Sequence, residues 1–558
     1  MLSRSATRLL GLRSSFVPSS PFLSVYFNDW KPNYFIPLRW YSKKKNEISK
    51  LIKLAEEGCT DSQYALGMNY IEGSGVAKDV EKGRVLLESA ADKGKKPEAF
   101  YKLGCLHYET GLLENALDEF LDAADLGYAK GQYAAGCIYV TEKFLDYSKA
   151  FHYFKLAADQ GHVESQVNLG QLFANGWGKE QNIERARETF HSVAAQGHPD
   201  GYYNLAKLEN ESGNFKKAVE YLKLAADGGS VDAEYEMGIF YATEPGDVLE
   251  NHQLAFEYLS KAAEKDHDEA QYDVSHYYLN GILFPVNEEK AIELLKKAVK
   301  KNNREAMYVL GELHTKKESS FFNVNKALKY YKQAADLGHV GAASYLGDYY
   351  SYVNSDYKTG ITYWQAAADL GDQHSQLMLA LAYFEGNGVA KNVHLAFKTT
   401  QALAEEGYSE AKFYLAAWCM QGTGTKIDYK RGIDLFTELA ETENHTVALY
   451  NLGVCYSNGN GVERDVDKAI GFFSKAAANG DVKSEFNAGL LYFEKVPPDI
   501  AGLDYIKSAA DKGYGKACYF LSKCYEDGRL LEKDDEKAAY YANVASAKGV
   551  TTLEDEKK

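Results

Sequence analysis

Residues 448–480 read ALYNLGVCYSNGNGVERDVDKAIGFFSKAAANG, and they contain two helix-forming stretches separated by a glycine-rich turn. Apolar residues recur at helical spacing on both sides of that turn. The turn, Asn458-Gly459-Asn460-Gly461, ends the first stretch because each glycine inside a helix costs about 1 kcal/mol. Asp465 suits the N-terminus of the second helix, and Gly480 suits its left-handed C-terminal cap. The stretch therefore predicts a helical hairpin.

The same pattern returns along nearly the whole chain. A small residue follows a Leu-like position at intervals of 32 to 37 residues, at Gly67, Gly104, Gly136, Gly170, Ala206, Gly238, Ser275, Gly311, Gly347, Ala380, Ala416, Gly453, Gly489 and Ser522. Its small size predicts that another backbone approaches closely there. A second pattern keeps step with the first: two small residues, two variable ones and usually glycine, as in Ala476-Ala477 to Gly480.

One hairpin of this length buries too little surface to fold alone, whereas stacked hairpins bury one another. The sequence thus predicts an all-α protein, an α-solenoid of about 14 hairpins forming one continuous superhelix without a conventional domain boundary. The low count of 10 prolines against 47 glycines fits many short helices punctuated by glycine.

These residues resemble the Sel1-like repeat family, a relative of the tetratricopeptide repeats. The family motif is met closely from Ala65-Leu66-Gly67 to Gly94 and from Leu452-Gly453 to Gly480. Its glycine loops recur at Gly73-Ser74-Gly75-Val76, Gly386-Asn387-Gly388-Val389 and Gly459-Asn460-Gly461-Val462. The resemblance covers roughly residues 46–549. It implies a tetratricopeptide-like superhelix and adaptor work between proteins.

The N-terminal segment has a different composition from the rest. Residues 1–45 carry eight basic side chains and one acidic side chain, Asp29, in a chain of net charge −16. On a helical wheel Arg4 and Arg8 share one face while Leu9 and Leu12 lie on another. An Arg- and Ser-rich, acid-poor amphipathic N-terminus is typical of a mitochondrial transit peptide.

The stretch Arg39-Trp40-Tyr41-Ser42 resembles the site cut by the matrix processing peptidase. Cleavage between Tyr41 and Ser42 would remove five basic residues and one acidic residue, changing the net charge from −16 to about −20. The predicted organisation is a transit peptide over 1–41, a basic segment and capping helix over 42–60, the solenoid over 61–549 and a polar tail over 550–558. The predicted location is the mitochondrial matrix or the matrix face of the inner membrane.

Three repeats depart from the pattern in their turns. One lacks the glycine loop and carries Glu209 where tyrosine is usual, another holds Lys316-Lys317-Glu318-Ser319-Ser320-Phe321-Phe322, and a third reads Glu494-Lys495-Val496-Pro497-Pro498. Such turns either contact a partner or tolerate drift, and drift is the simpler interpretation.

No catalytic, cofactor-binding or metal site is predicted. The 13 histidines form no His-Glu-x-x-His motif, and no Cys-x-x-Cys pair exists. Each Gly-x-Gly recurs with the repeat, which marks it as a turn. Cys105 and Cys137 share one column, and Cys455 and Cys524 share the next, where small buried thiols are expected. A tyrosine column three residues past the small position is expected to pack between hairpins.

The leading functional hypothesis is a non-enzymatic mitochondrial adaptor that holds one or more proteins along the solenoid surface. The resemblance suggests respiratory-complex assembly or other mitochondrial biogenesis. One alternative is a helical-repeat factor in mitochondrial gene expression, associated with RNA or the mitoribosome, although the negative charge disfavours nucleic acid. Another is an adaptor for degradation at the endoplasmic reticulum, as in the best-known members. No run of 18 apolar residues supports a transmembrane span.

Overall fold

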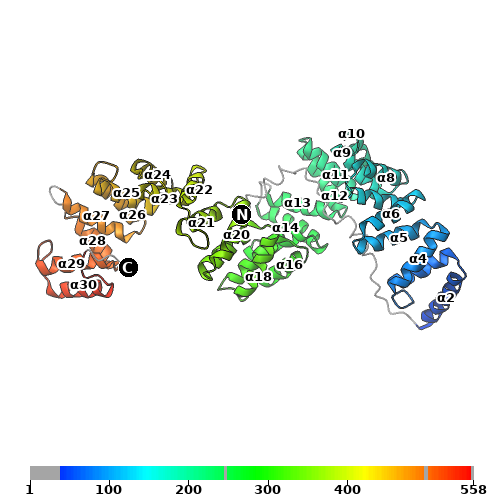
Figure 1. Ribbon diagram of the computed structural model, residues 1–558, viewed down its shortest axis with the longest axis horizontal. Helices are drawn as coiled ribbons and strands as arrows, with labels where there is room; N and C mark the ends of the chain where they lie inside the picture. The colour runs from blue at the N-terminus through cyan, green and yellow to red at the C-terminus, as the bar shows by residue number, and fades with distance from the viewer. Residues whose placement is uncertain (1–37, 244–247, 496–499, 554–558) are drawn as a thin grey trace. The chain divides into compact units, whose positions relative to one another are not determined.

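The computed structural model describes residues 38–243, 248–495 and 500–553, which fold into helices and turns without a strand (Figure 1). The expected all-α repeat solenoid is confirmed. The described residues contain fourteen helical hairpins, the number that the sequence predicts. The chain divides into two compact units, unit 1 up to Asn303 and unit 2 from Arg304, where one uninterrupted stack was expected.

Each hairpin consists of a first helix and a second helix. In unit 1 the first helices are α3 (Thr60–Glu72), α5 (Pro97–Glu109), α7 (Ala129–Tyr139), α9 (Val163–Asn175), α11 (Pro199–Glu211), α13 (Val231–Thr243) and α15 (Asp268–Asn280). The second helices are α4 (Val80–Gly94), α6 (Leu113–Asp125), α8 (Tyr147–Asp159), α10 (Ile183–Ala195), α12 (Phe215–Asp227), α14 (Val248–Glu264) and α16 (Glu288–Lys300).

Unit 2 repeats this order seven times. Its first helices are α17 (Arg304–Thr315), α19 (Val340–Asp348) with the π-helix η4 (Tyr349–Val353), α21 (Gln373–Glu385), α23 (Ser409–Gln421), α25 (Thr446–Asn458), α27 (Val482–Glu494) and α29 (Gly515–Asp527). Its second helices are α18 (Val324–Asp336), α20 (Tyr357–Asp369), α22 (Val393–Glu405), α24 (Tyr429–Glu443), α26 (Val466–Ala478), α28 (Gly502–Asp511) and α30 (Asp535–Ala547).

One further helix, α2 (Leu38–Glu56), precedes the first hairpin and packs on α3. Ile48 and Ala55 are buried, and Gln63 Nε2 donates to the Ala55 carbonyl oxygen at 3.2 Å. The bond between Tyr41 and Ser42 lies near the start of this helix. The rest of the expected transit peptide, residues 1–37, lies outside the described residues.

Polar caps explain where the second helices begin. Their N-cap side chains accept a hydrogen bond from the backbone N–H three residues later, as at Asp79, Asp146, Asn182, Asn287, Asn323, Asp356, Asn392, Asp428, Asp465 and Asp534. In the quoted hairpin, Asp465 N–H also donates to the Tyr456 carbonyl at 2.9 Å, which closes the turn. Gly459 and Gly461 in that turn have φ of 74° and 76°, a region that favours glycine.

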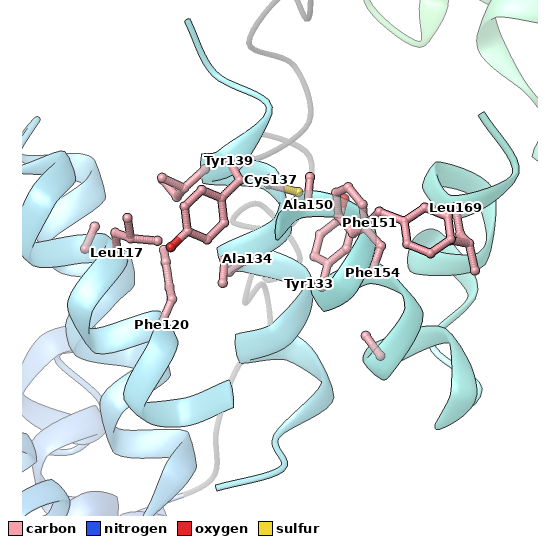
Figure 2. Packing of buried hydrophobic residues seen from close by; sticks show 14 of the residues in the cluster. Leu117, Phe120, Tyr133, Ala134, Cys137, Tyr139, Ala150, Phe151, Phe154 and Leu169 are labelled. Atoms are coloured by element: carbon pink, nitrogen blue, oxygen red, sulfur yellow. The ribbon is translucent and has the colours of Figure 1, made fainter. Parts of the chain in front are cut away.

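The column of small residues makes room for large side chains of the second helix. A β-carbon added at Gly136 would lie 2.6 Å from Cε1 of Phe154, and one at Gly453 would lie 2.7 Å from Phe473. Both rings are buried, and Figure 2 shows Phe154 beside Tyr133 within this core. At these two positions a ring of the same hairpin comes nearest, whereas at Gly67 and Gly489 the expected close backbone approach is present, with the carbonyl oxygens of Gly83 and Gly502 at 3.0 and 2.8 Å from an added β-carbon.

The second sequence pattern, two small residues followed three positions later by glycine, lies where a second helix ends and the next repeat begins. Gly480 has φ of 92°, which confirms the expected left-handed conformation after α26. Glutamines near the start of several first helices then donate to a carbonyl at the end of the preceding helix, eight residues earlier. These glutamines are Gln63, Gln132, Gln166, Gln271 and Gln376. The pattern thus satisfies carbonyls that a helix end leaves unpaired.

Lys95 occupies this left-handed position in the first hairpin, with φ of 47°, because Gly94 still belongs to α4. A left-handed conformation strains any residue with a β-carbon. We expect Lys95→Gly to raise the free energy of unfolding by about 0.5–1 kcal/mol. The urea midpoint of the helical circular dichroism signal measures this change. Lys95→Ala is the control, and an equal gain there would refute the explanation.

Candidate functional site

The first helices form one side of each unit, which we call the first-helix face. Contacts between alternate helices join first helices, α5 with α7 and α9 with α11 in unit 1, and α19 with α21 in unit 2. Side chains bridge these helices: Gln171 Nε2 donates to Asn204 Oδ1 at 3.1 Å, and Tyr203 OH donates to Glu236 Oε1 at 2.7 Å. In these places the face is a surface shared by residues from successive repeats.

In unit 1 this face is polar and acidic around α9, α11 and α13. Burial raises the pKa of Asp200, and the nearby carboxylates Asp232 and Glu164 raise it further. Burial also raises the pKa of Glu236, although the hydrogen bond from Tyr203 opposes this effect. The carboxylates are crowded and partly removed from water, so this surface favours neutral or positively charged neighbours.

In unit 2 the same face carries a group of aromatic and apolar side chains over α19, η4, α21 and α23. We call Tyr345, Tyr349, Tyr352, Met378, Leu381 and Tyr414 the aromatic stripe; they lie on α19, η4, α21 and α23. Tyr345 and Tyr349 stack with ring centroids 6.5 Å apart, and Tyr352 OH donates to Met378 Sδ at 3.3 Å. Met378, Leu381 and Tyr414 pack against one core cluster yet remain partly exposed. Tyr352 is exposed and the other five side chains are partly exposed, and a shared apolar surface of this kind is a candidate docking site.

Several histidines have a structural role that the sequence analysis missed. His162, His267, His339 and His445 are N-caps of first helices, and each Nδ1 accepts a backbone N–H three residues later. Each ring also packs on an aromatic side chain of the preceding repeat. A histidine just before a first helix, at repeat spacing, is the sequence signal that would have identified them.

This capping predicts that stability depends on pH at His162. Burial lowers the pKa of His162 below its ordinary value of 6.5, against the opposing charge of Glu164. The unfolded chain therefore binds this proton more readily, so the stabilisation present above about pH 6.5 is lost as the pH falls through the lowered value. We expect His162→Asn, which can cap without titrating, to flatten the profile of unfolding free energy between pH 7 and pH 5.

His374 is the matched control for that experiment. The hydrogen bond to Asp348 raises the pKa of His374, so its stabilisation is present at low pH and is lost as the pH rises through the raised value. His374→Asn should change the profile in the opposite sense. Parallel profiles for the wild-type chain and His162→Asn would contradict the capping explanation.

Where the structure describes the unusual turns, their residues contact other residues of this chain. Glu209, which is 1% exposed, pairs with Arg187 and accepts from Asn214 Nδ2 at 2.8 Å, so it joins α10, α11 and α12. The turn at 316–322 is held against α17, because Nδ1 of the buried His314 on that helix lies 2.5 Å from the Phe321 carbonyl oxygen. Of the third turn, residues 496–499 lie outside the described residues.

The tyrosine column stacks on rings of its own hairpin and also packs between hairpins as expected, since Tyr139 joins a core cluster with Leu117 of the preceding hairpin and the Tyr278 ring lies 6.0 Å from that of Phe256. Tyr139 stacks on Tyr153, Tyr350 on Tyr363, and Tyr525 on Tyr541, with ring centroids 5.7 to 6.0 Å apart. In each pair the first ring belongs to the first helix or its η4 extension and the second ring to the partner helix.

The cysteine columns are buried, as expected. Cys105, Cys137, Cys455 and Cys524 are free thiols in the interior. Burial raises the pKa of Cys105 to about 11 and that of Cys137 to about 12, so both stay protonated at neutral pH. A protonated thiol is a poor nucleophile, which fits a packing role.

Within residues 38–243, 248–495 and 500–553, no three His, Cys, Asp or Glu side chains are placed to hold a metal ion. None of the helices in these ranges combines the length and apolar character needed to cross a membrane. A cavity of about 370 Å³ lies between α2, α3 and α4, lined mainly by apolar residues such as Ile52, Leu66 and Val85.

Comparison with family models gives one result. The Sel1 repeat model matches twelve segments, which are residues 60–95, 123–162, 163–198, 199–230, 231–267, 268–303, 304–339, 340–372, 373–407, 409–441, 446–481 and 515–550. These segments cover well over half of the chain, and their boundaries follow the hairpins described above.

Curated relatives match shorter stretches. Chitin synthase regulatory factor 2 of Schizosaccharomyces pombe is 33% identical over 159 residues, which are 26% of this chain and 30% of that protein. DAP3-binding cell death enhancer 1 of Rattus norvegicus is 29% identical over 163 residues, 28% of this chain and 32% of that protein. The aligned stretches thus span about a third of the length of these relatives.

Among solved structures, a protective antigen of uropathogenic Escherichia coli strains, described as displaying an SLR fold, aligns with a TM-score of 0.44. The two sequences are 21% identical, and the alignment covers 92% of this chain and 98% of that chain.

Proposed function

The chain belongs to the Sel1 repeat family, and from this we propose that it is a non-enzymatic mitochondrial adaptor that holds another protein against its first-helix face. The observation that carries the proposal is the aromatic stripe of unit 2, whose apolar side chains remain partly exposed. Adaptors of this architecture gain affinity by adding many weak contacts along such a face.

The names of the relatives agree with a role in protein interaction, since one is called a chitin synthase regulatory factor and the other a DAP3-binding protein. The mitochondrial part of the proposal rests on the basic, acid-poor segment 1–41 and the processing-like bond between Tyr41 and Ser42. Respiratory-complex assembly or another step of mitochondrial biogenesis is the proposed process, on family resemblance.

The experiment is affinity capture of the tagged full-length chain from isolated mitochondria, compared with a variant of the stripe. Tyr414→Glu places a charge on the first-helix face, and we expect it to remove the captured partner. Leu395→Glu is the matched control, because Leu395 is an exposed leucine on the second helix α22. Equal recovery of the partner by both variants would argue against the proposed face.

The same sample tests the location. The mature chain is expected to begin at Ser42 when its N-terminus is sequenced. A chain that instead shifts in mobility after glycosidase treatment would support the alternative of an adaptor at the endoplasmic reticulum. Co-purification of RNA that is lost steeply with added salt would support the gene-expression alternative.

A further inference from the structure

The end of the first helix in the 340–372 repeat differs from all others. Tyr352 and Val353 are 58% and 70% exposed. Tyr352 stands five residues after the small residue Gly347. The other thirteen repeats have polar residues at this position: Glu72, Glu109, Thr141, Asn175, Glu211, Thr243, Asn280, Lys316, Glu385, Gln421, Asn458, Glu494 and Asp527. The fold of a repeat therefore does not require an aromatic ring there.

The π-helix η4 places this ring. Asn354 N–H donates to the Tyr349 carbonyl, five residues earlier, at 3.0 Å, and Asp356 N–H donates to the Tyr350 carbonyl at 2.7 Å. The widened turn replaces the glycine loop of other repeats and leaves Tyr352 reaching towards α21, where its hydroxyl contacts Met378. Single π-turns of this kind are frequent at functional sites.

Two further rings surround Tyr352. The centroid of Trp364 lies 5.7 Å away, and that of Tyr357 lies 6.5 Å away with its ring almost perpendicular. Trp364 is only 1% exposed, and its Nε1 donates to Asp348 Oδ1 at 3.0 Å. Because Trp364 is buried and hydrogen-bonded, its ring has a fixed position against the exposed ring of Tyr352.

The carboxylates of Asp348 and Glu385 lie near this aromatic group, and the basic side chain of His374 contacts Asp348. Partial burial of the hydroxyl end of Tyr352, together with the carboxylates of Asp348 and Glu385, raises the pKa of Tyr352 to about 12. Asp348 also accepts a hydrogen bond from His374, whose pKa is raised chiefly by that bond and further by the charges of Asp372 and Glu410. A positive charge close to Tyr352 would meet both the aromatic faces and the carboxylates.

We propose that Tyr352, Tyr357 and Asp348 bind an arginine or lysine side chain from an apolar segment of the partner protein, with the neighbouring apolar side chains resting on the aromatic stripe. The cation would lie over the tyrosine rings and close to the Asp348 carboxylate. This proposal rests on the adaptor function proposed above, and it adds the chemistry of the segment that the adaptor recognises.

The test uses the purified full-length chain and two short fluorescein-labelled peptides. One is built of leucine, alanine and arginine, and its twin carries neutral citrulline in place of each arginine. Fluorescence anisotropy should show about tenfold tighter binding of the arginine peptide. Tyr352→Asn, which installs the residue found at this position in α9, α15 and α25, should abolish the preference, whereas Tyr352→Phe should keep it.

The matched control is Tyr540→Asn, since Tyr540 is an exposed tyrosine on the second helix α30. It should leave the preference for arginine unchanged. Equal affinities of the wild-type chain for both peptides, or a preference that survives in Tyr352→Asn, would overturn the proposal. Capture of the natural partner by Tyr352→Asn but not by Tyr414→Glu would reject the cation site alone. Capture by both variants would reject the proposed face as well.

Discussion

Replacing Phe190 by alanine is expected to lower the free energy of unfolding by about 3–5 kcal/mol. The Phe190 ring is almost completely buried, and it lies over Gly170, where an added β-carbon would be 2.5 Å from its Cε1 atom. Truncation leaves a cavity between α9 and α10 that neighbouring helices fill only in part. Chemical denaturation followed by circular dichroism measures the loss, and hydrogen exchange locates it in these two helices.

A double-mutant cycle shows whether the glycine and the ring act together. Gly170→Ala alone should cost about 1–3 kcal/mol by overpacking. In the Phe190→Ala background the added methyl group meets no ring, so the double mutant should be more stable than the sum of the single effects predicts by about 1 kcal/mol or more. Gly471→Ala is the control glycine, since an added β-carbon there meets nothing within 4 Å. Simple additivity at Gly170 and Phe190 would contradict the packing argument.

Removing Arg187, the ion-pair partner of Glu209, is expected to have the second large effect on stability. Arg187→Leu should cost about 3 kcal/mol, because it leaves a buried carboxylate with weaker compensation. Glu209 is nearly inaccessible to water, and it then retains Asn214 Nδ2 at 2.8 Å and the Lys217 ammonium at 3.4 Å. Thermal unfolding of the full-length chain and hydrogen exchange in α11 and α12 measure the effect.

The direction in which stability changes with pH is a second test of the interactions of Glu209. Burial raises the pKa of Glu209, but the hydrogen bonds from Asn214 and Arg187 outweigh it and hold the pKa below its ordinary value. The stabilisation is therefore present above about pH 4.5 and is lost as the pH falls through the lowered value. Glu209→Gln should remove this dependence. The double variant that combines Arg187→Leu with Glu209→Tyr is expected to recover much of the stability, as apolar replacements of buried ion pairs often do; no recovery would show that the turn requires the carboxylate.

The sequence alone was sufficient to predict the number of hairpins and their helical structure. Aspartate and asparagine caps such as Asp465, glycine after the second helix such as Gly480, and apolar residues at helical spacing are local signals. They depend on residues within a few positions of one another, so they are readable from one chain. The same applies to the family resemblance, which the family model then confirmed over most of the chain.

Local sequence signals did not identify which side chains pack against each other. The space at Gly453 is filled by Phe473 of the same hairpin, and Tyr139 stacks on Tyr153 of the same hairpin. Sequence spacing alone did not distinguish these arrangements from contacts between hairpins. Glu209 looked like drift in the sequence, yet its carboxylate pairs with Arg187 of the preceding repeat.

The candidate binding surface depended most on the tertiary structure. Among the fourteen repeats only one has an aromatic residue at the position of Tyr352, yet nothing in the sequence links Tyr352, Met378 and Tyr414, which lie in three successive repeats. They form one surface only because neighbouring first helices pack side by side and the π-turn at η4 directs Tyr352 towards Met378. The repeat pattern determined that helices would stack, whereas the stacking itself decided which side chains meet on the exposed face.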